Sequence, residues 1–200
     1  MIFDSDAYWE KRYAGKGNSG DGSYGQLANF KAEIINGIIK DYRIKSIVDY
    51  GVGDGNQYST LNLENATYYG IDISPTAISI CKNMFPDKSN CFMSVNEYKE
   101  MNTACELSMS CDVLYHLIDE DLYHSYLKNL FEFSNKYILI YARNQTKKHA
   151  EHVYFREFND YFVDTYKCTL IKKFPNRYPQ KILGLDNSTT SPSDFYLYLK

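Results

Sequence analysis

The sequence predicts an α/β protein built on a doubly wound, mainly parallel sheet with helices on both faces. Short apolar runs alternate with amphipathic stretches, and this alternation builds parallel sheets through right-handed crossovers. The apolar run 46–49 ends in an acid and leads into a Gly-x-Gly-x-Gly turn at residues 51–55. A second run, 67–72, also ends in an acid. Acids at the carboxyl ends of neighbouring strands lie where open α/β sheets bind their ligands.

Each further element is predicted from its local pattern. Apolar residues recur at helical spacing in 26–41, which predicts an amphipathic helix before the first strand. Ser74 is a favourable N-cap with Pro75 at the first helical position, so a helix is expected to run to Met84. Asp119 predicts another helix start. The remaining predicted elements are strands at 90–94, 107–115, 137–141, 169–174 and 194–199 and a helix at 153–166.

Composition favours one compact domain. The 200 residues are 44% hydrophobic, enough for a single sizeable core. A net charge of −3 argues against a large nucleic-acid-binding surface. We expect no membrane span and no signal peptide, and hence a cytoplasmic protein, because apolar runs are short and the first residues are acidic. The five cysteines lack Cys-x-x-Cys spacing, so neither disulfides nor a metal site is expected.

The glycine turn after the first strand indicates a ligand held against bare backbone. Its third glycine, Gly55, comes one residue earlier than in the dinucleotide fingerprint, and Asp54 lies within the turn. A carboxylate there would repel a pyrophosphate but suits a cationic or zwitterionic ligand. The alternative is a strand-to-helix connection that binds nothing.

Asp72 ends the second predicted strand. An acid at this position suits a bidentate hydrogen bond to ribose hydroxyls. The alternative is a carboxylate placed beside the start of the next helix, where the helix dipole favours negative charge. The ribose role is preferred because both acids fall at the ends of strands in consecutive units.

These motifs resemble those of the class I S-adenosylmethionine-dependent methyltransferases. Residues 48–55 are similar to their motif I, residues 70–74 to motif II and residues 106–117 to motif IV. The N-terminal segments 8–13, 19–25 and 30–32 resemble a narrower group, the small-molecule methyltransferases of bacterial capsule and surface-polysaccharide gene clusters, including those of O-methyl phosphoramidate decoration. The resemblance covers nearly the whole chain and implies a Rossmann-like sheet of seven strands, the last antiparallel.

The resemblance also implies a cofactor, S-adenosyl-L-methionine, with S-adenosyl-L-homocysteine as product. Asp49, Gly51 and Gly53 would line its methionine portion, with Gly55 and Gln57 close by. The other implied cofactor contacts are Asp72 at the ribose, Ile73 and Asn96 at the adenine, Cys111 and Asp112 near the donor sulfur, and Arg12 or Tyr13 at the carboxylate.

Two segments are predicted to be working parts outside the sheet. The glycine-rich stretch 15–25 is flanked by aromatic residues, which favours a lid over the cofactor rather than a linker. The stretch 176–193 is a long loop that either borders the substrate or only connects two strands. The predicted layout of the single domain, 1–200, is a lid and helix at 1–45, a cofactor-binding core at 46–142, and a substrate-side helix, loop and closing strands at 143–200.

Candidate acceptor-side residues follow the fourth and fifth strands. His116, beside Tyr115, is the first choice as a base or hydrogen-bond donor, although packing against the next helix is an equal alternative. His152 and Arg156 lie four residues apart, on one face if that stretch is helical, and suit an anionic substrate. The alternative for this basic region is an exposed, solvated face.

The sequence therefore predicts a methyltransferase acting on a small polar, anionic acceptor such as a phosphate, phosphoramidate or sugar. The expected reaction is O-methylation in bacterial capsule or surface-polysaccharide biosynthesis, with N-methylation less favoured. A nicotinamide-dependent oxidoreductase and a non-catalytic S-adenosylmethionine-binding partner are the alternatives. The expected partner is the small-molecule acceptor, without nucleic acid or membrane, and the oligomeric state is left open.

Overall fold

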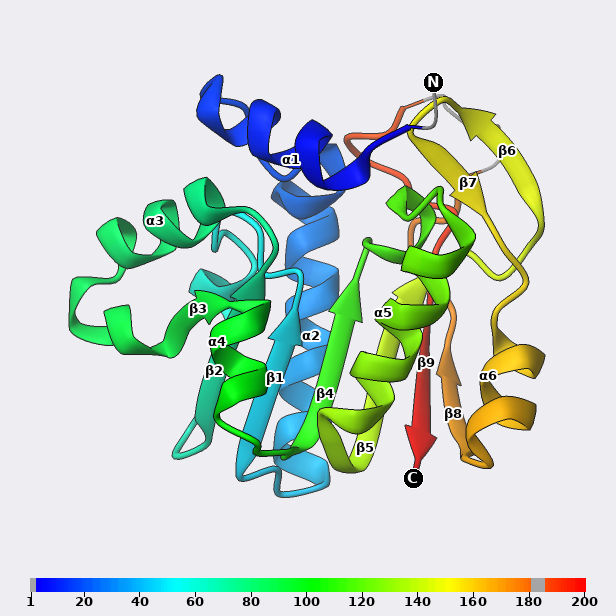
Figure 1. The fold of residues 1–200 in the computed structure, drawn as a ribbon. Coiled ribbons are helices and arrows are strands. Elements are labelled where there is room, and N and C mark those ends of the chain that lie inside the picture. The colour runs from blue at the N-terminus through cyan, green and yellow to red at the C-terminus, as the bar shows by residue number, and fades with distance from the viewer. Residues whose placement is uncertain (1–2, 181–185) are drawn as a thin grey trace.

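A seven-stranded sheet organises the computed structural model, which describes residues 3–180 and 186–200 (Figure 1). Its strands are β1 (Ser46–Tyr50), β2 (Thr67–Asp72), β3 (Phe92–Ser94), β4 (Cys105–Cys111), β5 (Ser134–Ala142), β8 (Thr169–Phe174) and β9 (Asp194–Leu199). They lie in the order β3-β2-β1-β4-β5-β9-β8, and β9 is antiparallel to both of its neighbours. This confirms the predicted Rossmann-like sheet and its antiparallel last strand.

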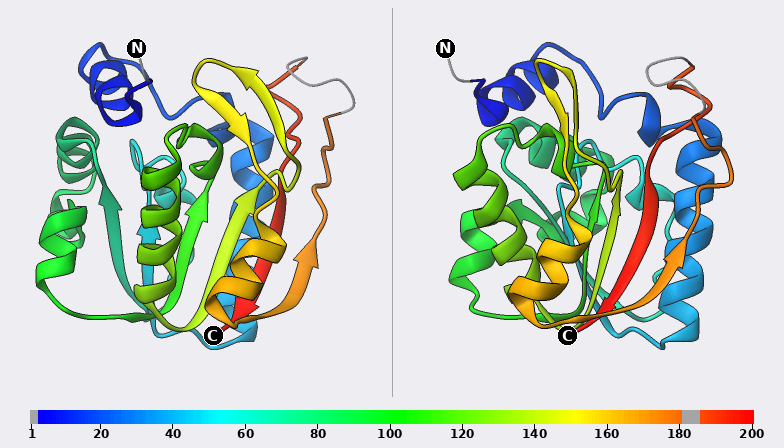
Figure 2. Two further views of the ribbon diagram at one scale, coloured as in Figure 1. Left: turned by 45° about the vertical axis from the view of Figure 1, so that its right-hand side comes forward. Right: turned by 90° about the vertical axis from the view of Figure 1, so that its right-hand side faces the viewer.

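Helices cover both faces of the sheet (Figure 2). They are α1 (Ser5–Ala14), α2 (Gly25–Asp41), α3 (Pro75–Met84), α4 (Val95–Glu100), α5 (Glu120–Glu132) and α6 (Asn159–Tyr166). Side chains of α2 and α3 pack in one apolar core against one face, and those of α4, α5 and α6 pack in a second core against the other. The central strands of the sheet are therefore buried on both faces, as expected for a parallel sheet.

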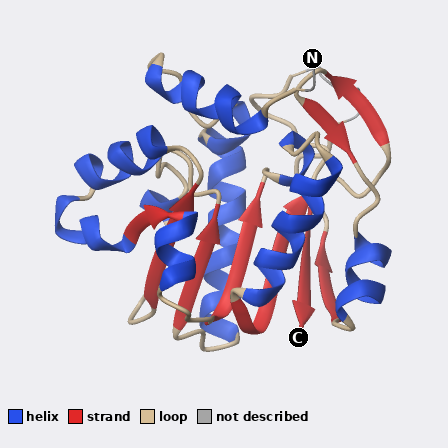
Figure 3. Ribbon diagram, in the orientation of Figure 1, coloured by secondary structure: helices blue, strands red, loops and turns tan. Residues whose placement is uncertain are grey.

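The predicted helix starts are confirmed. The Ser74 hydroxyl accepts a hydrogen bond from the backbone N–H of Ala77, and Pro75 opens α3. The Asp119 carboxylate accepts one from the backbone N–H of Leu122 at 2.9 Å. These caps fix the ends of α3 and α5 that lie nearest the carboxyl edge of the sheet (Figure 3).

The predicted helix at 153–166 is wrong in its first part. Residues Lys147–Ala150 and Val153–Phe155 form an antiparallel hairpin, β6 and β7, and helix starts only at Asn159. Val153 and Phe155 are buried whereas Tyr154 is half-buried, so the side chains alternate with the period of a strand. His152 and Arg156 therefore do not share a helix face.

The predicted fourth strand is also too long. It ends at Cys111, because Asp112 has a left-handed backbone with φ of 61°. Leu114–His116 then form a short 3-10 helix, η4. Tyr115 and His116 are thus carried by this turn above the sheet rather than by the strand.

Helix α1 crosses above the carboxyl ends of the strands, and the hairpin stands beside it (Figures 1 and 2). The hydroxyl of Ser5 donates a hydrogen bond to the carbonyl oxygen of His116 at 2.6 Å, which joins α1 to η4. Within residues 3–180 and 186–200, no helix has both the length and the apolar character that a membrane crossing requires.

Candidate functional site

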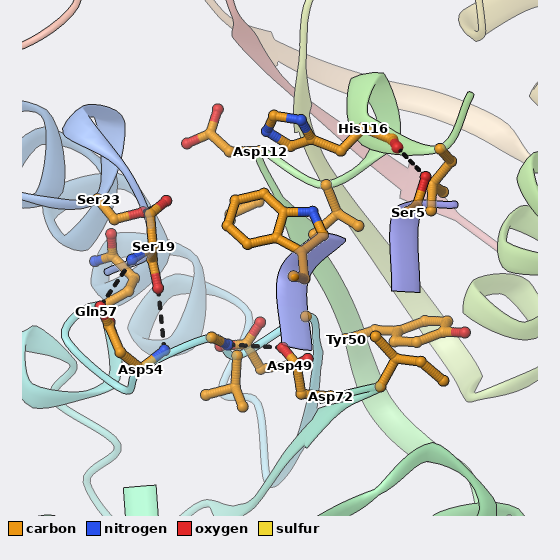
Figure 4. Close-up of a pocket in the computed structure, with 18 of the residues that line it drawn as sticks. Ser5, Ser19, Ser23, Asp49, Tyr50, Asp54, Gln57, Asp72, Asp112 and His116 are labelled. Carbon is orange, nitrogen blue, oxygen red and sulfur yellow. Dashed lines mark hydrogen bonds between the residues drawn. The ribbon is translucent and has the colours of Figure 1, made fainter. Parts of the chain in front are cut away.

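A first cavity lies at the carboxyl ends of β1, β2 and β4, beneath α1. Asp49 and the glycine turn lie at the end of β1, Asp72 and Ile73 at the end of β2, and Cys111 and Asp112 at the end of β4. Figure 4 shows Asp49, Asp72 and Asp112 around this cavity. Residues of α1 and the glycine-rich segment also line it: Ser5, Asp6, Trp9, Tyr13, Ser19 and Ser23. The topology thus collects residues that lie far apart in the sequence at a single edge of the sheet.

The glycine turn and Asp72 form one hydrogen-bonded unit. The Asp72 carboxylate accepts from the backbone N–H of Gly53 and from that of Ser74, both at 2.9 Å. Gly53 has a φ of 61°, and a Cβ there would come within 2.3 Å of the Ser19 hydroxyl. Glycine is therefore required at this position by both backbone conformation and space.

Asp49 lies deep in the first cavity. It is 3% exposed and accepts a hydrogen bond from the Tyr68 hydroxyl at 2.8 Å. Burial raises the pKa of Asp49 to about 7, against the opposing effects of Tyr68 and Lys31. This carboxyl group therefore changes its charge near neutral pH and suits a cationic or zwitterionic ligand.

Gln57 brings an unpartnered acceptor to the same cavity. Its amide nitrogen donates to the Ala28 carbonyl at 3.2 Å and to the Thr60 hydroxyl at 2.9 Å. Its Oε1 atom is buried and has no hydrogen-bond partner among the described residues. A buried acceptor without a donor is costly, so a ligand N–H or O–H fits beside it.

The glycine-rich segment closes over the glycine turn. The backbone N–H of Ser19 and the hydroxyl of Tyr24 donate to the Asp54 carboxylate at 2.9 and 2.5 Å. Glu10 of α1 accepts from the hydroxyls of Ser74 and Thr76 at the start of α3. The glycine-rich segment is therefore fastened to the glycine turn, and α1 is fastened to the start of α3.

A second cavity adjoins the first. Its walls come from α1, the glycine-rich segment, η4, the β6–β7 hairpin and the stretch before β9. The basic and aromatic residues that line it are Arg12, His116, His149, His152, Tyr8, Trp9, Tyr115 and Phe155. Trp9, Ser19, Ser23, Asp112 and His116 line both cavities.

His116 lies where the two cavities meet. Its Nδ1 atom is 2.9 Å from the carbonyl oxygen of His152, which makes Nδ1 the protonated nitrogen of a neutral ring. The His116 ring stacks on that of His152 with centroids 5.9 Å apart and packs edge-on against Trp9. Burial lowers the pKa of His116 to about 4, so the ring is a hydrogen-bonding group and a weak base at neutral pH.

Asp112 also lies at this junction, and it forms a buried ion pair. Its Oδ2 atom is 2.7 Å from the Lys31 ammonium of α2, whose side chain is 2% exposed. The Tyr115 hydroxyl donates to Oδ1 at 2.9 Å. Burial is the largest single effect and acts to lower the pKa of Lys31, but the attraction of Asp112, Cys111 and Asp49 and the hydrogen bond to Asp112 together raise that pKa.

Similar solved structures are methyltransferases. No protein-family model and no curated protein matches the sequence. The N-methyltransferase NodS of Bradyrhizobium japonicum WM9, in complex with S-adenosyl-L-homocysteine, is 11% identical with a TM-score of 0.71 over 99% of both chains. Magnesium protoporphyrin IX methyltransferase of Synechocystis PCC 6803 with bound S-adenosylmethionine is 12% identical, with a TM-score of 0.67 over 99% of this chain and 98% of that one. The small RNA methyltransferase HEN1 is 14% identical, with a TM-score of 0.63 over 89% of this chain and 26% of that one.

The chain has the fold of the S-adenosylmethionine-dependent methyltransferases. Identities this low establish the fold alone. The first cavity of this chain lies at the carboxyl edge of the sheet, where Asp49, Asp72 and the glycine turn meet. Most of the predicted cofactor residues line it: Tyr13, Asp49, Gly51, Gly53, Gln57, Asp72, Ile73, Cys111 and Asp112.

Three predicted cofactor residues lie elsewhere. Gly55 faces Cys81 and Phe85 and supports the back of the turn. Asn96 is an exposed residue of α4, a helix that starts directly after β3 and turns this side chain to solvent. Arg12 lines the second cavity, with its guanidinium 5.5 Å above the Trp9 ring. None of these three residues lines the first cavity.

The predicted substrate role of Arg156 requires correction. Arg156 lines neither cavity. Its guanidinium donates to the carbonyls of Leu117 and Ile118 at 2.7 and 2.8 Å and pairs with Glu120. The rings of Tyr123 and Tyr154 cover it, with centroids 4.4 and 4.3 Å from its central carbon. These contacts occupy the N–H donors and both faces of the guanidinium. Arg156 therefore joins the hairpin to the end of η4.

Sequence reasoning missed the role of Lys31 altogether. Its signal was a lysine on the apolar face of an amphipathic helix, next to Phe30, where a charged residue requires a buried partner. The partner itself, Asp112, lies 81 residues further along the chain. Glu10, which caps the α3 start from α1, was missed for the same reason.

Proposed function

We propose that this chain is an S-adenosylmethionine-dependent methyltransferase. The donor lies in the first cavity, and a small polar, anionic acceptor lies in the second. The observation that carries the proposal is the hydrogen-bonded unit of Asp72 and Gly53, which joins an acid suited to ribose hydroxyls to a glycine turn within one cavity. The likeness of the fold supports it.

The residues of the first cavity fit this donor. Asp72 offers a carboxylate to ribose hydroxyls, and the neighbouring Ile73 is 50% exposed and offers an apolar surface to a purine ring. Asp49 and the unpartnered Oε1 of Gln57 suit the ammonium of an amino acid. The donor supplies a methyl group already activated by a sulfonium charge, so the chain must align the reactants and exclude water.

The second cavity fits an anion. Its basic residues are Arg12, His116, His149 and His152, of which Arg12 carries a permanent positive charge. Arg12 forms no ion pair with an acid of the described residues and is instead held by Asn18 at 2.6 Å and by the Trp9 ring. Asp21 and Asp112 also line the cavity, but Lys31 compensates the charge of Asp112. A planar, oriented guanidinium suits a phosphate-like group.

We extend the proposal to O-methylation in bacterial capsule or surface-polysaccharide biosynthesis. This extension is supported by the N-terminal resemblance and by the basic groups of the second cavity. An anionic oxygen requires no base, which agrees with a weakly basic His116 at the junction. The exclusion of nucleic acid stays a prediction, because one of the similar structures is a small RNA methyltransferase.

Calorimetric titration tests the donor site first. We expect S-adenosylhomocysteine to bind at micromolar or lower concentration and NAD to bind at least a hundredfold more weakly. Binding of NAD alone would favour the oxidoreductase alternative and remove the proposal. Labelled S-adenosylmethionine is then offered with phosphorylated sugars, nucleotide-linked phosphoramidates, free glycosides and short RNA. Donor binding without transfer to any of these compounds would favour a non-catalytic S-adenosylmethionine-binding protein.

A further inference from the structure

The β6–β7 hairpin presents basic residues on the side that faces the second cavity. Phe155 of β7 is 3% exposed and lines this cavity, and Lys147 of β6 is its direct cross-strand partner. Directly opposed residues of an antiparallel pair lie on the same side of a hairpin. His149 also lines the cavity, with its ring centroid 6.3 Å from that of Phe155. Lys147 and His149 therefore lie on the cavity side of the hairpin, which stands beside α1 (Figure 2).

Arg143, directly after β5, brings a third basic residue to this side. Its guanidinium carbon lies 5.2 Å from the centroid of the Phe155 ring. Its Nε atom donates to the side-chain oxygen of Gln145 at 3.0 Å. Within the described part of the chain, it forms no ion pair with an acid. Arg143, Lys147 and His149 thus surround Phe155, and we call these three residues the hairpin basic patch.

Arg12 and Arg143 are held in the same way. Each guanidinium lies over an aromatic ring that lines the second cavity, Trp9 or Phe155. Each donates to an uncharged amide oxygen, whereas the Arg156 guanidinium pairs with a carboxylate. An arginine that is oriented but not neutralised by the chain suits an anion supplied by a ligand.

The positive charges of α1 and of the hairpin act on the same place. Burial lowers the pKa of His152, and the charges of Arg12 and His149 lower it further, whereas the charge of Glu151 opposes them. These basic groups therefore repel one another across the second cavity. An anion bound between them would relieve that repulsion.

We propose that the acceptor carries two anionic groups, and that Arg143 and Lys147 bind the second one beside Phe155, next to the second cavity. This inference rests on the proposed function, which places one anionic group of the acceptor inside that cavity. His149 belongs to both the cavity wall and the hairpin basic patch, so it lies between the two anion sites.

The size of the hairpin basic patch favours a small compound, such as a sugar bisphosphate or a diphosphate. Proteins that bind nucleic acid through its backbone commonly neutralise about 6–10 phosphates. The patch offers three basic side chains, and the chain as a whole has a net charge of −3. A second phosphate-like group is what these few charges can hold.

The test compares glucose 6-phosphate, glucose 1,6-bisphosphate and pyrophosphate, titrated by calorimetry into the full chain with bound S-adenosylhomocysteine. The two doubly charged probes differ in the spacing of their phosphates, because the distance between the anion sites depends on the acceptor. We expect at least one of them to bind roughly tenfold more tightly than glucose 6-phosphate.

Three single variants show whether this gain comes from the hairpin basic patch. Lys147→Gln and Arg143→Gln should each weaken the tighter doubly charged probe by roughly fivefold and glucose 6-phosphate by less than about twofold. Lys148→Gln is the matched control, because Lys148 is the next exposed residue of the same strand and is paired with Tyr154 on the other side of the hairpin. It removes the same charge and should leave all three affinities within roughly twofold of wild type.

The possible results separate the two proposals. Failure of the wild-type protein to bind S-adenosylhomocysteine would remove the proposed function itself. With normal S-adenosylhomocysteine binding, equal affinities for the three probes would overturn the second anion site and leave the donor site intact. Equal losses in Lys147→Gln and Lys148→Gln would do the same and would identify these lysines as a solvated face. Because Arg143→Gln also removes a contact with a buried ring, the exposed Lys147 decides if the two variants disagree.

A short single-stranded RNA is the last probe. If it binds more tightly than both doubly charged probes, and weakens equally in Lys147→Gln and Lys148→Gln, the partner is nucleic acid and the inference of a small acceptor is overturned. RNA binding weaker than that of the tighter doubly charged probe supports the small acceptor.

Discussion

Ser19 and Asp54 exchange two hydrogen bonds across the mouth of the first cavity. The backbone N–H of Ser19 donates to the Asp54 carboxylate at 2.9 Å, and the backbone N–H of Asp54 donates to the Ser19 hydroxyl at 3.0 Å. The same hydroxyl is 3.1 Å from the Tyr13 hydroxyl of α1. A single small side chain thus joins the glycine-rich segment, the glycine turn and α1.

Ser19→Ala should loosen this closure without unfolding the protein. The Asp54 N–H loses its partner, and a lost hydrogen bond of this kind costs about 1 kcal/mol, which corresponds to roughly fivefold weaker binding of S-adenosylhomocysteine. Stopped-flow or surface-based kinetics should place most of the change in the dissociation rate. Lys11→Ala, an exposed change on α1, is the control, and equal effects of both variants would contradict a closing role for Ser19.

Asp72→Ala should weaken S-adenosylhomocysteine binding by about tenfold or more, because a charged hydrogen-bond acceptor is worth about 1.5–3 kcal/mol. The variant also frees the N–H groups of Gly53 and Ser74, so Asp72→Asn is measured beside it. Asp87→Asn, an exposed acid after α3, serves as the control. Unchanged affinity in both Asp72 variants would remove the ribose role.

Donor binding should strengthen as the pH rises from 6 to 8. Burial raises the pKa of Asp49 to about 7, so the group is largely protonated at pH 6 and largely ionised at pH 8. A cationic donor favours the ionised form, and binding therefore releases a proton. The gain in affinity for the donor cannot exceed about tenfold per pH unit. Calorimetry of Asp49→Asn should give a flat profile over this range, and a slope as steep as that of the wild-type protein would contradict the assignment.

Acid should destabilise the wild-type protein through His116. Burial lowers the pKa of His116 to about 4 in the folded protein, whereas the unfolded chain keeps its usual value near 6.5. Between these values the unfolded state binds more protons, so this residue makes the free energy of unfolding fall as the pH drops, by at most about 1.4 kcal/mol per unit. Chemical denaturation of His116→Asn at pH 5 and pH 7.5 checks this. The difference in free energy of unfolding between the wild-type protein and the variant should be smaller at pH 5 than at pH 7.5. An equal or larger difference at pH 5 would contradict this role of His116.

The central sheet was predictable because its signals are local. The apolar runs, the Ser74 and Asp119 caps and the helix at 26–41 each depend on neighbouring residues. The hairpin at 147–155 was not predictable from the sequence. Its strands are short, and the pattern around Val153 and Phe155 fits a helix and a strand equally well until the partner strand is known.

The cofactor side of the site was more predictable than the acceptor side for a related reason. Asp49, Gly53 and Asp72 fall at strand ends whose positions follow from the sheet order. The second cavity is assembled from Arg12, His149 and His152, which reach it from α1 and the hairpin. Their meeting depends on how these two elements pack above the sheet, and no local pattern encodes that packing.

The two arginines Arg12 and Arg156 should therefore behave oppositely. Arg156→Ala leaves the carbonyls of Leu117 and Ile118 without donors and removes the contact with two rings, so the free energy of unfolding should fall by about 2 kcal/mol. Arg12→Ala removes a half-buried cation with one hydrogen-bonded carbonyl and one ring contact, and should lower that free energy by only about 1 kcal/mol. Binding of inorganic phosphate in the presence of S-adenosylhomocysteine, followed by NMR of the histidine ring protons, should weaken in Arg12→Ala by roughly fivefold or more. In Arg156→Ala, measured at a temperature where it is fully folded, phosphate binding should stay within roughly twofold of wild type. The reverse pattern would restore Arg156 to the acceptor site and exclude Arg12 from it.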